Sequence, residues 1–358
     1  MAAATRQRVA AYVPYLERAG ISCTLAPLLD DDFFRDFYSP GGTVRKAAGL
    51  AARHAARAAV LLRARRWDAV FVQREAAIVG PEIIEALLVR GAGLPLIYDL
   101  DDAIWLTSGP PSSFPLAKRL LTAPGKTARL VEMARQVIAG SRHLAAWCEE
   151  HGASTTVLPT VVSRETWRPR QERERGDFAN DVPVVGWVGS PSTALELARI
   201  LPALARLRAE GVRFRVRVVG AGADLTTPDL DIENIPWSAS RELEDFRSLD
   251  VGLAPMGNDA WSEGKCGYKQ LQYLAVGVPC VSSLAGGARE FIVPNENALL
   301  AGDLDEWTRQ VRRLLEDRAL RARLSAGGRA LVEKTHCLEA QAPTFVGVIQ
   351  RAFADRNG

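Results

Sequence analysis

Residues 261–283, WSEGKCGYKQLQYLAVGVPCVSS, contain a glycine-bearing loop, a helical pattern and a short buried strand in direct succession. The loop carries Lys265, and the predicted helix begins near Lys269. Backbone N–H groups at the start of a helix point at whatever lies in front of it, and the helix dipole favours an anion there. With two lysines added, the segment predicts a diphosphate site. The alternative, a solvated charged loop, stays open because runs of charge are usually surface features.

Short apolar strands alternate with helical patterns on both sides of this segment, which predicts parallel βα units. The predicted strands are 21–26, 68–73, 94–99, 136–139, 155–158, 182–188, 214–219, 251–254 and 279–283. The predicted helices include 6–19, 44–66, 81–90, helices between 114 and 134, 195–209, 241–249, 269–276, and two helices within 304–334 that are separated near Asp317. Crossover helices on both sheet faces give an α/β fold of two doubly wound, Rossmann-like domains.

A polar segment without periodicity, 162–180, separates the two series of strands. Such composition is typical of an interdomain linker. We therefore expect a first domain at 1–165, a linker at 166–181 and a second domain at 182–337. Ligands of such domains bind at the carboxyl ends of the strands, so the two domains should face one another across a cleft.

The bulk composition excludes several classes of protein. A net charge of +3 on 358 residues argues against a dedicated nucleic-acid binder. The five cysteines are scattered and form no C-x-x-C pair, so neither a disulfide framework nor a zinc site is indicated. The first twenty residues lack the apolar core of a signal peptide, and no run of about eighteen apolar residues occurs. We expect a cytoplasmic protein.

Three carboxylates follow the predicted strand at 94–99, in the stretch LPLIYDLDDAIW. Asp99, Asp101 and Asp102 raise one another's pKa unless cations or hydrogen-bond donors compensate. They fit the nucleophile and acid of a phosphoaspartyl hydrolase, a divalent-metal site, or the polar mouth of a substrate cleft. The hydrolase pattern D-x-D-x-[TV] fails at Ala103, and Arg74, after the preceding strand, is a plausible counter-ion.

The motifs of the second half resemble the donor-binding half of GT-B glycosyltransferases, most closely family 4 (group 1). The resemblance rests on GKCGYKQLQYLAVGVPCVSS, GGAREFI, ENALLAGD and DVGLAPM, and extends to YDLDDAIW and VIAGS in the first half. It implies transfer of a sugar from a nucleotide-diphosphate sugar to an acceptor hydroxyl, with retention and without a metal or other cofactor. Biosynthesis of a surface glycan or a secondary metabolite is the expected setting. A helix at 338–356 should return to the first domain.

The resemblance assigns donor-binding roles to residues of the opening segment. Lys269 would contact the donor phosphate, and Gly264 and Lys265 would face the diphosphate or the sugar. Gln272 occupies the position where the family usually has a glutamate that binds the ribose. The family's paired glutamates would fall at 264 and 272, but here Glu263 lies one place off. Donor binding is therefore expected, while donor identity stays open.

The other half of the diphosphate site usually follows the first strand of the second domain, here VVGWVGSPST. Gly189 would allow close approach of the backbone to the ligand, and Ser190 and Ser192 would bind the donor or cap the next helix. Both interpretations of the serines stay open. The Arg and Lys that many relatives carry there are absent.

The resemblance places the acceptor in the first domain. Asp99, Asp101 and Asp102, with Lys265, form the expected catalytic group, and the acceptor side consists of Arg6, Arg8 and Arg74. Relatives begin with a strand and a glycine-rich loop before the motif that here reads TRQR. We therefore expect the first strand of the N-terminal domain to be missing.

Residues 44–66 form a basic amphipathic pattern with seven Arg or Lys and no acidic residue. Such a helix could lie on anionic lipid at the inner membrane face, which would suit a lipid-linked acceptor. A carbohydrate or small-molecule acceptor is equally compatible, and the helix could instead be an Ala-rich core helix or a positive rim. Two other functions are retained: a phosphoaspartyl hydrolase using Asp99 and Asp101, and a non-catalytic nucleotide-sugar binding protein.

Overall fold

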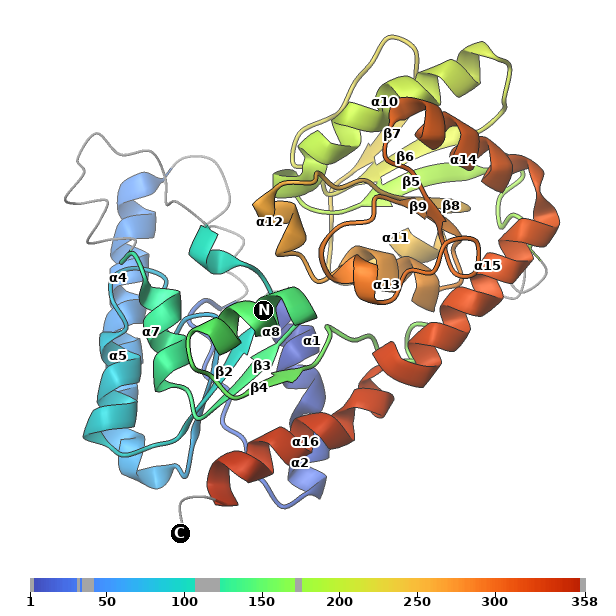
Figure 1. Ribbon diagram of the computed structural model, residues 1–358. Helices are drawn as coiled ribbons and strands as arrows, with labels where there is room; N and C mark the ends of the chain where they lie inside the picture. The colour runs from blue at the N-terminus through green and yellow to red at the C-terminus, as the bar shows by residue number, and fades with distance from the viewer. Residues whose placement is uncertain (1–2, 31–32, 34–41, 107–122, 171–175, 355–358) are drawn as a thin grey trace. The chain divides into compact units, whose positions relative to one another are not determined.

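A computed structural model of the chain describes residues 3–30, 33, 42–106, 123–170 and 176–354 (Figure 1). The chain forms two compact units, each with its own parallel sheet. Unit 1 comprises Met1–Thr160 and Gln341–Gly358, and unit 2 comprises Val161–Ala340. The predicted α/β fold with parallel sheets is confirmed; the cleft between the domains stays a prediction.

The sheet of unit 1 has the strand order β1-β2-β3-β4 in the described residues. Its strands are β1 (Val70–Gln73), β2 (Leu96–Leu100), β3 (Gln136–Ala139) and β4 (Thr155–Val157). One face, which includes Leu96, Tyr98 and Leu100, packs against helices that connect the strands. These helices are α5 (Ile83–Ala86), η3 (Leu87–Gly91), α7 (Lys126–Met133) and α8 (Arg142–Glu150).

The opposite face of this sheet is covered by segments from both ends of the chain. Side chains alternate along β2, so Asp99 lies on the face opposite Leu96 and Leu100. On that face, Phe345 of α16 (Leu338–Ala354) stacks on Tyr12 with ring centroids 4.1 Å apart and contacts Phe71 of β1 at 5.7 Å. The C-terminal helix is therefore an integral part of unit 1.

Other segments of unit 1 differ from the sequence-based expectations. The helix expected at 6–19 is divided into α1 (Ala3–Arg8), η1 (Ala10–Tyr12) and α2 (Val13–Arg18). The strand predicted at 21–26 is wrong: the segment forms no strand. An extended segment becomes a strand only where another backbone satisfies its N–H and C=O groups. The helix at 44–66 is formed by α4 (Thr43–Ala58) and η2 (Ala59–Arg66), and η4 spans Ile104–Leu106.

The sheet of unit 2 has the strand order β10-β9-β8-β5-β6-β7. Its strands are β5 (Val184–Val188), β6 (Arg215–Val219), β7 (Ile232–Ile235), β8 (Val251–Ala254), β9 (Cys280–Ser282) and β10 (Leu299–Leu300). The strand order reverses between β5 and β8, which makes this sheet doubly wound. In open α/β sheets, the carboxyl end of such a junction is the usual ligand site.

Helices cover both faces of this sheet. On one face, α10 (Ala194–Ala209) and α14 (Leu304–Glu316) enclose a core that includes Trp187 and Trp307. On the other, α11 (Glu242–Arg247) and α13 (Tyr268–Ala275) enclose a core that includes Phe246 and Tyr273. The remaining elements of unit 2 are η5 (Pro191–Thr193), α12 (Ala260–Glu263), η6 (Gly286–Glu290), α15 (Arg318–Leu331) and η7 (Val332–His336).

The segment expected to be a linker is largely part of unit 2. Trp167 is buried and lies 5.5 Å from Phe246 between ring centroids. Asn180 donates to Asp250 at 2.7 Å, and the carbonyl of Gly176 accepts from Arg321 at 2.7 Å. These contacts explain why a polar segment without periodicity is nonetheless fixed to the domain. Residues 171–175 of the expected linker, 114–122 of the predicted helices and 355–356 of the C-terminal helix lie outside the described residues.

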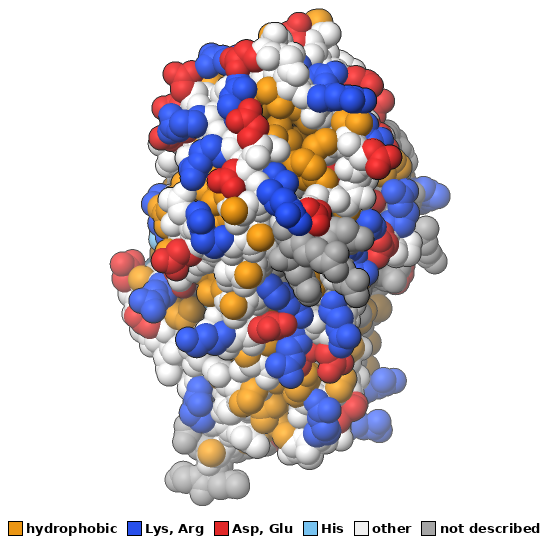
Figure 2. All heavy atoms as spheres, turned by 90° about the vertical axis from the view of Figure 1, so that its right-hand side faces the viewer, with side chains coloured by type: hydrophobic (Ala, Val, Ile, Leu, Met, Phe, Trp, Pro, Cys, Tyr) orange, Lys and Arg blue, Asp and Glu red, His pale blue; other side chains and the backbone are white. Residues whose placement is uncertain are grey.

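The surface carries both signs of charge. Figure 2 shows one face on which basic side chains are interspersed with acidic and hydrophobic ones instead of forming one basic field. This distribution agrees with the low net charge of +3. Among the described helices, none combines the length and the apolar character needed to cross a bilayer.

Candidate functional site

Helix α13 is fixed over the junction of β5 and β8 by Tyr273. The phenolic oxygen of Tyr273 accepts from the backbone N–H of Val188 at 3.3 Å and donates to the carbonyl of Leu253 at 3.1 Å. Gly252 lies beneath the ring, where a Cβ would come within 2.7 Å of it. The small residue in β8 thus allows the helix to pack closely, and its first turn lies near the carboxyl edge of the sheet.

Lys269 is the second residue of α13 and holds its ammonium group inside the protein. The Nζ atom is 4.0 Å from the ring centroid of Trp187 in β5. It is buried and has no hydrogen-bond partner among the described residues. Burial lowers the pKa of Lys269 to about 7. In the part of the chain that the structure describes, the contact that stabilises this cation is the face of the Trp187 ring, so the arrangement favours an incoming anion.

The glycine after β5 has a packing role. A Cβ on Gly189 would lie 2.2 Å from the ring of Trp187, so only glycine allows the ring to occupy its place beneath Lys269. The sequence predicted close approach of the Gly189 backbone to a ligand. The structure gives a different reason for the glycine, namely support of the lysine site.

Ser190 and Ser192 lie exposed at the start of η5, directly after β5. Their hydroxyl groups are 2.9 Å apart, and neither one caps the following helix. The capping interpretation is therefore wrong for these two serines. Their donor-binding role stays a prediction.

The loop around α12 is tied to η6. Glu263 accepts from Arg289 at 2.8 Å and from the backbone N–H of Gly286 at 3.2 Å. The carbonyl of Lys265 accepts from Gly287 N–H at 2.7 Å, and its Nζ lies 4.0 Å from the ring centroid of Trp261. Gly264 is the buried C-cap of α12. The predicted roles of Glu263, Gly264 and Lys265 toward a donor stay predictions.

Gln272 forms a buried contact with a residue that the sequence did not single out. Its Nε2 atom donates to the carboxylate of Glu242, the first residue of α11, at 3.2 Å. Both side chains are buried. Sequence patterns missed Glu242 because an acidic residue in the first turn of a helix is a common stabilising feature.

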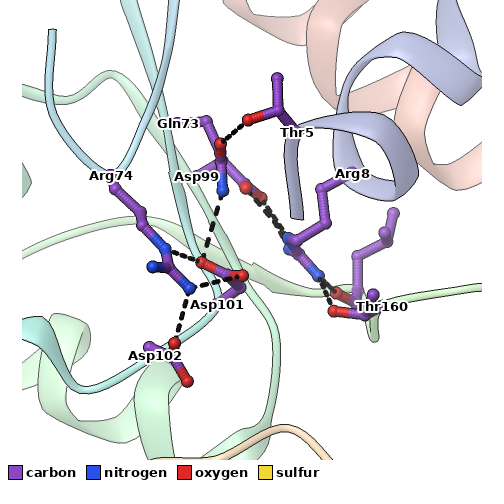
Figure 3. A network of polar contacts seen from close by, with 9 residues as sticks. Thr5, Arg8, Gln73, Arg74, Asp99, Asp101, Asp102 and Thr160 are labelled. Atoms are coloured by element: carbon purple, nitrogen blue, oxygen red, sulfur yellow. Dashed lines mark hydrogen bonds and ion pairs between the residues drawn. The ribbon is translucent and has the colours of Figure 1, made fainter. Parts of the chain in front are cut away.

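In unit 1, the predicted carboxylates are separated into two different environments (Figure 3). Asp99 is fully buried against Arg8, whose Nη2 donates to it at 2.6 Å and whose Nε donates at 2.9 Å. Arg8 Nη1 also donates to the carbonyl of Leu158 and to Thr160. Burial raises the pKa of Asp99, although the Arg8 guanidinium works in the opposite direction.

Asp101 and Asp102 are held by Arg74, the expected counter-ion. Arg74 Nε donates to Asp101 at 2.6 Å, and Nη2 donates to Asp102 at 2.5 Å. Arg74 has a backbone φ of +61°, an uncommon value for a residue other than glycine. Because its side chain is 38% exposed, this ion-pair cluster can meet a substrate, whereas the fully buried Asp99 cannot.

These environments weaken the hydrolase interpretation, since its nucleophile Asp99 is buried and bonded to Arg8. No group of three or more His, Cys, Asp or Glu in the described residues is placed to hold a metal ion. Arg6, the third residue expected on the acceptor side, lies partly buried on α1.

A cavity of about 1900 Å³ lies within unit 1. Arg74, Glu75 and Lys126 contribute polar groups to its lining, which is otherwise mostly apolar and includes Trp105 and Trp147. The two tryptophans stack with their ring centroids 3.9 Å apart. The partly exposed ion-pair cluster and the cavity thus share Arg74.

Residues 182–317 match the family model of the glycosyl transferases group 1. This range covers the β5–β8 junction, α13 and the Lys269 site. Unit 2 contains a group 1 glycosyltransferase domain. A search of curated protein sequences finds no match.

Solved glycosyltransferase structures share the fold of the chain. HepE from Anabaena, in complex with UDP-glucose, is 16% identical, has a TM-score of 0.61 and aligns over 82% of each chain. Sucrose-phosphate synthase from Thermosynechococcus elongatus is 15% identical, with a TM-score of 0.61 over 94% of this chain and 83% of the other. A glycosyltransferase from Rickettsia africae is 12% identical, with a TM-score of 0.60 over 96% and 88%. The protein is a glycosyltransferase with the GT-B fold, as the sequence motifs implied.

Proposed function

We propose that this glycosyltransferase binds a nucleotide-diphosphate sugar in unit 2, with the diphosphate against Lys269, and transfers the sugar to an acceptor hydroxyl at unit 1. The observation that supports this best is the buried ammonium of Lys269, held over Trp187 without an acceptor among the described residues. Such a cation gains most from a ligand that brings its own negative charge into the same dry site.

Lys269 has a direct chemical task in the transfer. When the glycosidic bond to the diphosphate breaks, negative charge develops on the departing phosphate oxygen. An ammonium already positioned in a poorly solvated site stabilises that charge with little rearrangement. The positive end of the α13 dipole also favours an anion at the same place. We propose that transfer needs no metal and retains the anomeric configuration.

The acceptor site is proposed at the partly exposed ion-pair cluster of Arg74, Asp101 and Asp102 in unit 1. Asp101 and Asp102 supply acceptors for a sugar hydroxyl, and Arg74 forms ion pairs with both carboxylates. Asp99, Arg8 and Thr160 support this strand end from behind. A carbohydrate acceptor is supported by the structure of HepE from Anabaena with UDP and glucose, which shares the fold. Synthesis of a surface glycan or a secondary metabolite is the proposed setting.

Helices α4 and η2 are proposed to contact an anionic membrane surface. Val44 and Leu62 are 85% and 89% exposed, and Arg45, Arg63 and Arg65 lie exposed beside them. Arg53 and Arg57 point toward the protein instead, bonding Asp30 and the carbonyl of Ala26. Exposed apolar groups flanked by arginines suit the lipid interface.

Vesicle sedimentation tests the membrane proposal. The protein should bind vesicles with anionic lipid and not neutral ones, and L62E should reduce binding several-fold, as expected for a charge placed in the interface. Equal binding by L62E, or no binding to anionic vesicles at low salt, would refute it.

A thermal-shift panel tests the donor proposal. UDP-, GDP-, ADP- and dTDP-sugars are added with and without EDTA, beginning with UDP-glucose because HepE binds it. Stabilisation by one nucleotide class, unchanged by EDTA, is expected. Stabilisation abolished by EDTA would contradict the metal-independent mechanism.

A turnover assay distinguishes an active enzyme from a non-catalytic binding protein. Release of the nucleoside diphosphate should increase when a sugar acceptor is supplied with the stabilising donor. Binding of the donor without release over a broad acceptor panel would favour the non-catalytic alternative. The configuration of the product reports retention or inversion.

A further inference from the structure

The contact between Glu242 and Gln272 joins two helices that begin at the same edge of the sheet. Helix α11 follows β7, and α13 follows β8, so both start at the carboxyl ends of parallel strands. They pack on one another through Phe246 and Tyr273, whose ring centroids are 5.0 Å apart. Glu242 therefore reaches the site from α11 although it is thirty positions away from Gln272 in the sequence.

This contact lies one helical turn from the buried ammonium. Lys269 and Gln272 are three residues apart on α13 and so lie on neighbouring positions of one helix surface. In a nucleoside diphosphate, the ribose is directly attached to the phosphates. If the diphosphate lies at Lys269, as the proposed function requires, a group one turn away is well placed to meet the ribose.

The pair of Glu242 and Gln272 is chemically suited to bind a diol. The two neighbouring ribose hydroxyls are hydrogen-bond donors, and a carboxylate can accept from both, because its two oxygens provide about four acceptor positions. The amide N–H of Gln272 uses one of these positions and holds the carboxylate in place. Bonds to an ionised acceptor are stronger than bonds to a neutral amide.

We propose that Glu242 recognises the ribose diol of the donor nucleotide, with Gln272 as its positioning residue. The resemblance to other glycosyltransferases placed this task at position 272, where the chain has an amide. In this structure the carboxylate comes from a different helix, α11. The proposal rests on the proposed function, because it assumes that the diphosphate binds at Lys269.

Titration calorimetry with a nucleoside diphosphate and its 2′-deoxy analogue tests the assignment. UDP is the first probe, followed by the other diphosphates of the panel. The wild-type protein should bind the ribonucleotide roughly tenfold more tightly than the deoxy analogue, the effect of one charge-assisted hydrogen bond. E242Q should weaken the ribonucleotide more than the deoxy analogue, which keeps only the 3′-hydroxyl, so the preference for the ribonucleotide should largely disappear.

Two further variants distinguish recognition of the ribose by Glu242 from a purely structural role of this residue. E244Q changes an exposed glutamate on the same helix and should preserve the preference for the ribonucleotide. E242D retains a carboxylate and should preserve part of it. If E242Q weakens both nucleotides equally, or if the wild-type protein does not distinguish them, Glu242 does not recognise the diol.

Failure of the Glu242 assignment can be distinguished from failure of the proposed function. If UDP and the other nucleoside diphosphates do not bind at all, or bind equally well to K269A, the proposed donor site is wrong and the Glu242 assignment falls with it. If binding depends on Lys269 while E242Q leaves the preference intact, only the Glu242 assignment is overturned.

Discussion

Lys269 illustrates how a binding group can be recognised from what surrounds it. Buried lysines normally have a carboxylate partner, because an isolated charge is costly to desolvate. Here the described residues provide only the ring of Trp187, and the pKa of the ammonium falls to about 7. The fold therefore maintains a cation at a cost in stability that a ligand can offset.

This cost predicts that K269M stabilises the free protein. In the unfolded chain the lysine pKa is about 10.4, whereas in the folded protein it is about 7. Between these values the unfolded state holds a proton that the folded state lacks, so the free energy of unfolding falls as the pH falls toward 7. K269M lacks this group and should be more stable at pH 7 by at least about 1 kcal/mol.

Urea unfolding at pH 7 and pH 9 measures this effect, with K334A as a control for loss of an exposed lysine in the same unit. The advantage of K269M should shrink at pH 9, and K334A should behave like the wild type. A K269M protein less stable than the wild type at pH 7 would show that the ammonium is not strained.

For individual residues, the sequence allowed only part of the site to be predicted. Lys269 and Gln272 lie on one recognisable motif, so their proximity follows from helix geometry. Trp187, Glu242 and the bond from Arg8 to Asp99 were missed, because their partners are brought together by packing of separate elements. Nothing in the local sequence distinguishes such residues from ordinary core or surface positions.

Strand β2 shows how one element divides neighbouring carboxylates between different tasks. Asp99 is the fourth residue of the strand and faces Arg8 in the interior, whereas Asp101 and Asp102 follow the strand and meet Arg74 near the surface. We infer that Asp99 supports the strand end and that Asp101 and Asp102 face the acceptor.

A double-mutant cycle tests the supporting role of Asp99. R8M leaves a buried carboxylate without its cation and should destabilise the protein by about 3–5 kcal/mol. In R8M/D99L both charges are gone, and chemical unfolding should show a smaller loss than for R8M alone. Additive losses from the two single variants would indicate that the buried pair is not coupled.

Local sequence patterns explain which helices and strands could be predicted. Strands β5, β6, β8 and β9 and helix α13 have clear apolar patterns bounded by glycine or proline, and they form at nearly the expected positions. Strands β7 and β10 were not predicted from the sequence. The segment 21–26 has an apolar pattern but no partner strand, so propensity alone could not decide it. Trp167 fixes the expected linker to unit 2, a long-range contact that composition does not reveal.

For the molecule as a whole, unit 1 is assembled from both ends of the chain. Residues after Gln341 return to the sheet formed by the first 160 residues, and Phe345 is buried there. A contact between residues so far apart in sequence could be expected only from the resemblance to GT-B enzymes. It makes the stability of unit 1 dependent on the last helix.

F345A should therefore destabilise unit 1 by about 3–5 kcal/mol, because it empties the space between Tyr12 and Phe71. F353A, a change in the same helix at a partly buried position, should cost less. Both variants can be compared by thermal unfolding. Equal losses would mean that the helix is held by general apolar burial and not by the aromatic stack.

The most direct test of the account is the affinity of the stabilising nucleotide sugar for the wild type, K269A and K334A. Titration calorimetry at pH 7 should show that K269A weakens binding by at least about 1.5 kcal/mol, the lower range for a charge-assisted contact. K334A should leave the affinity unchanged. Unchanged binding by K269A, in a folded protein, would remove the buried lysine from the donor site and contradict the central claim.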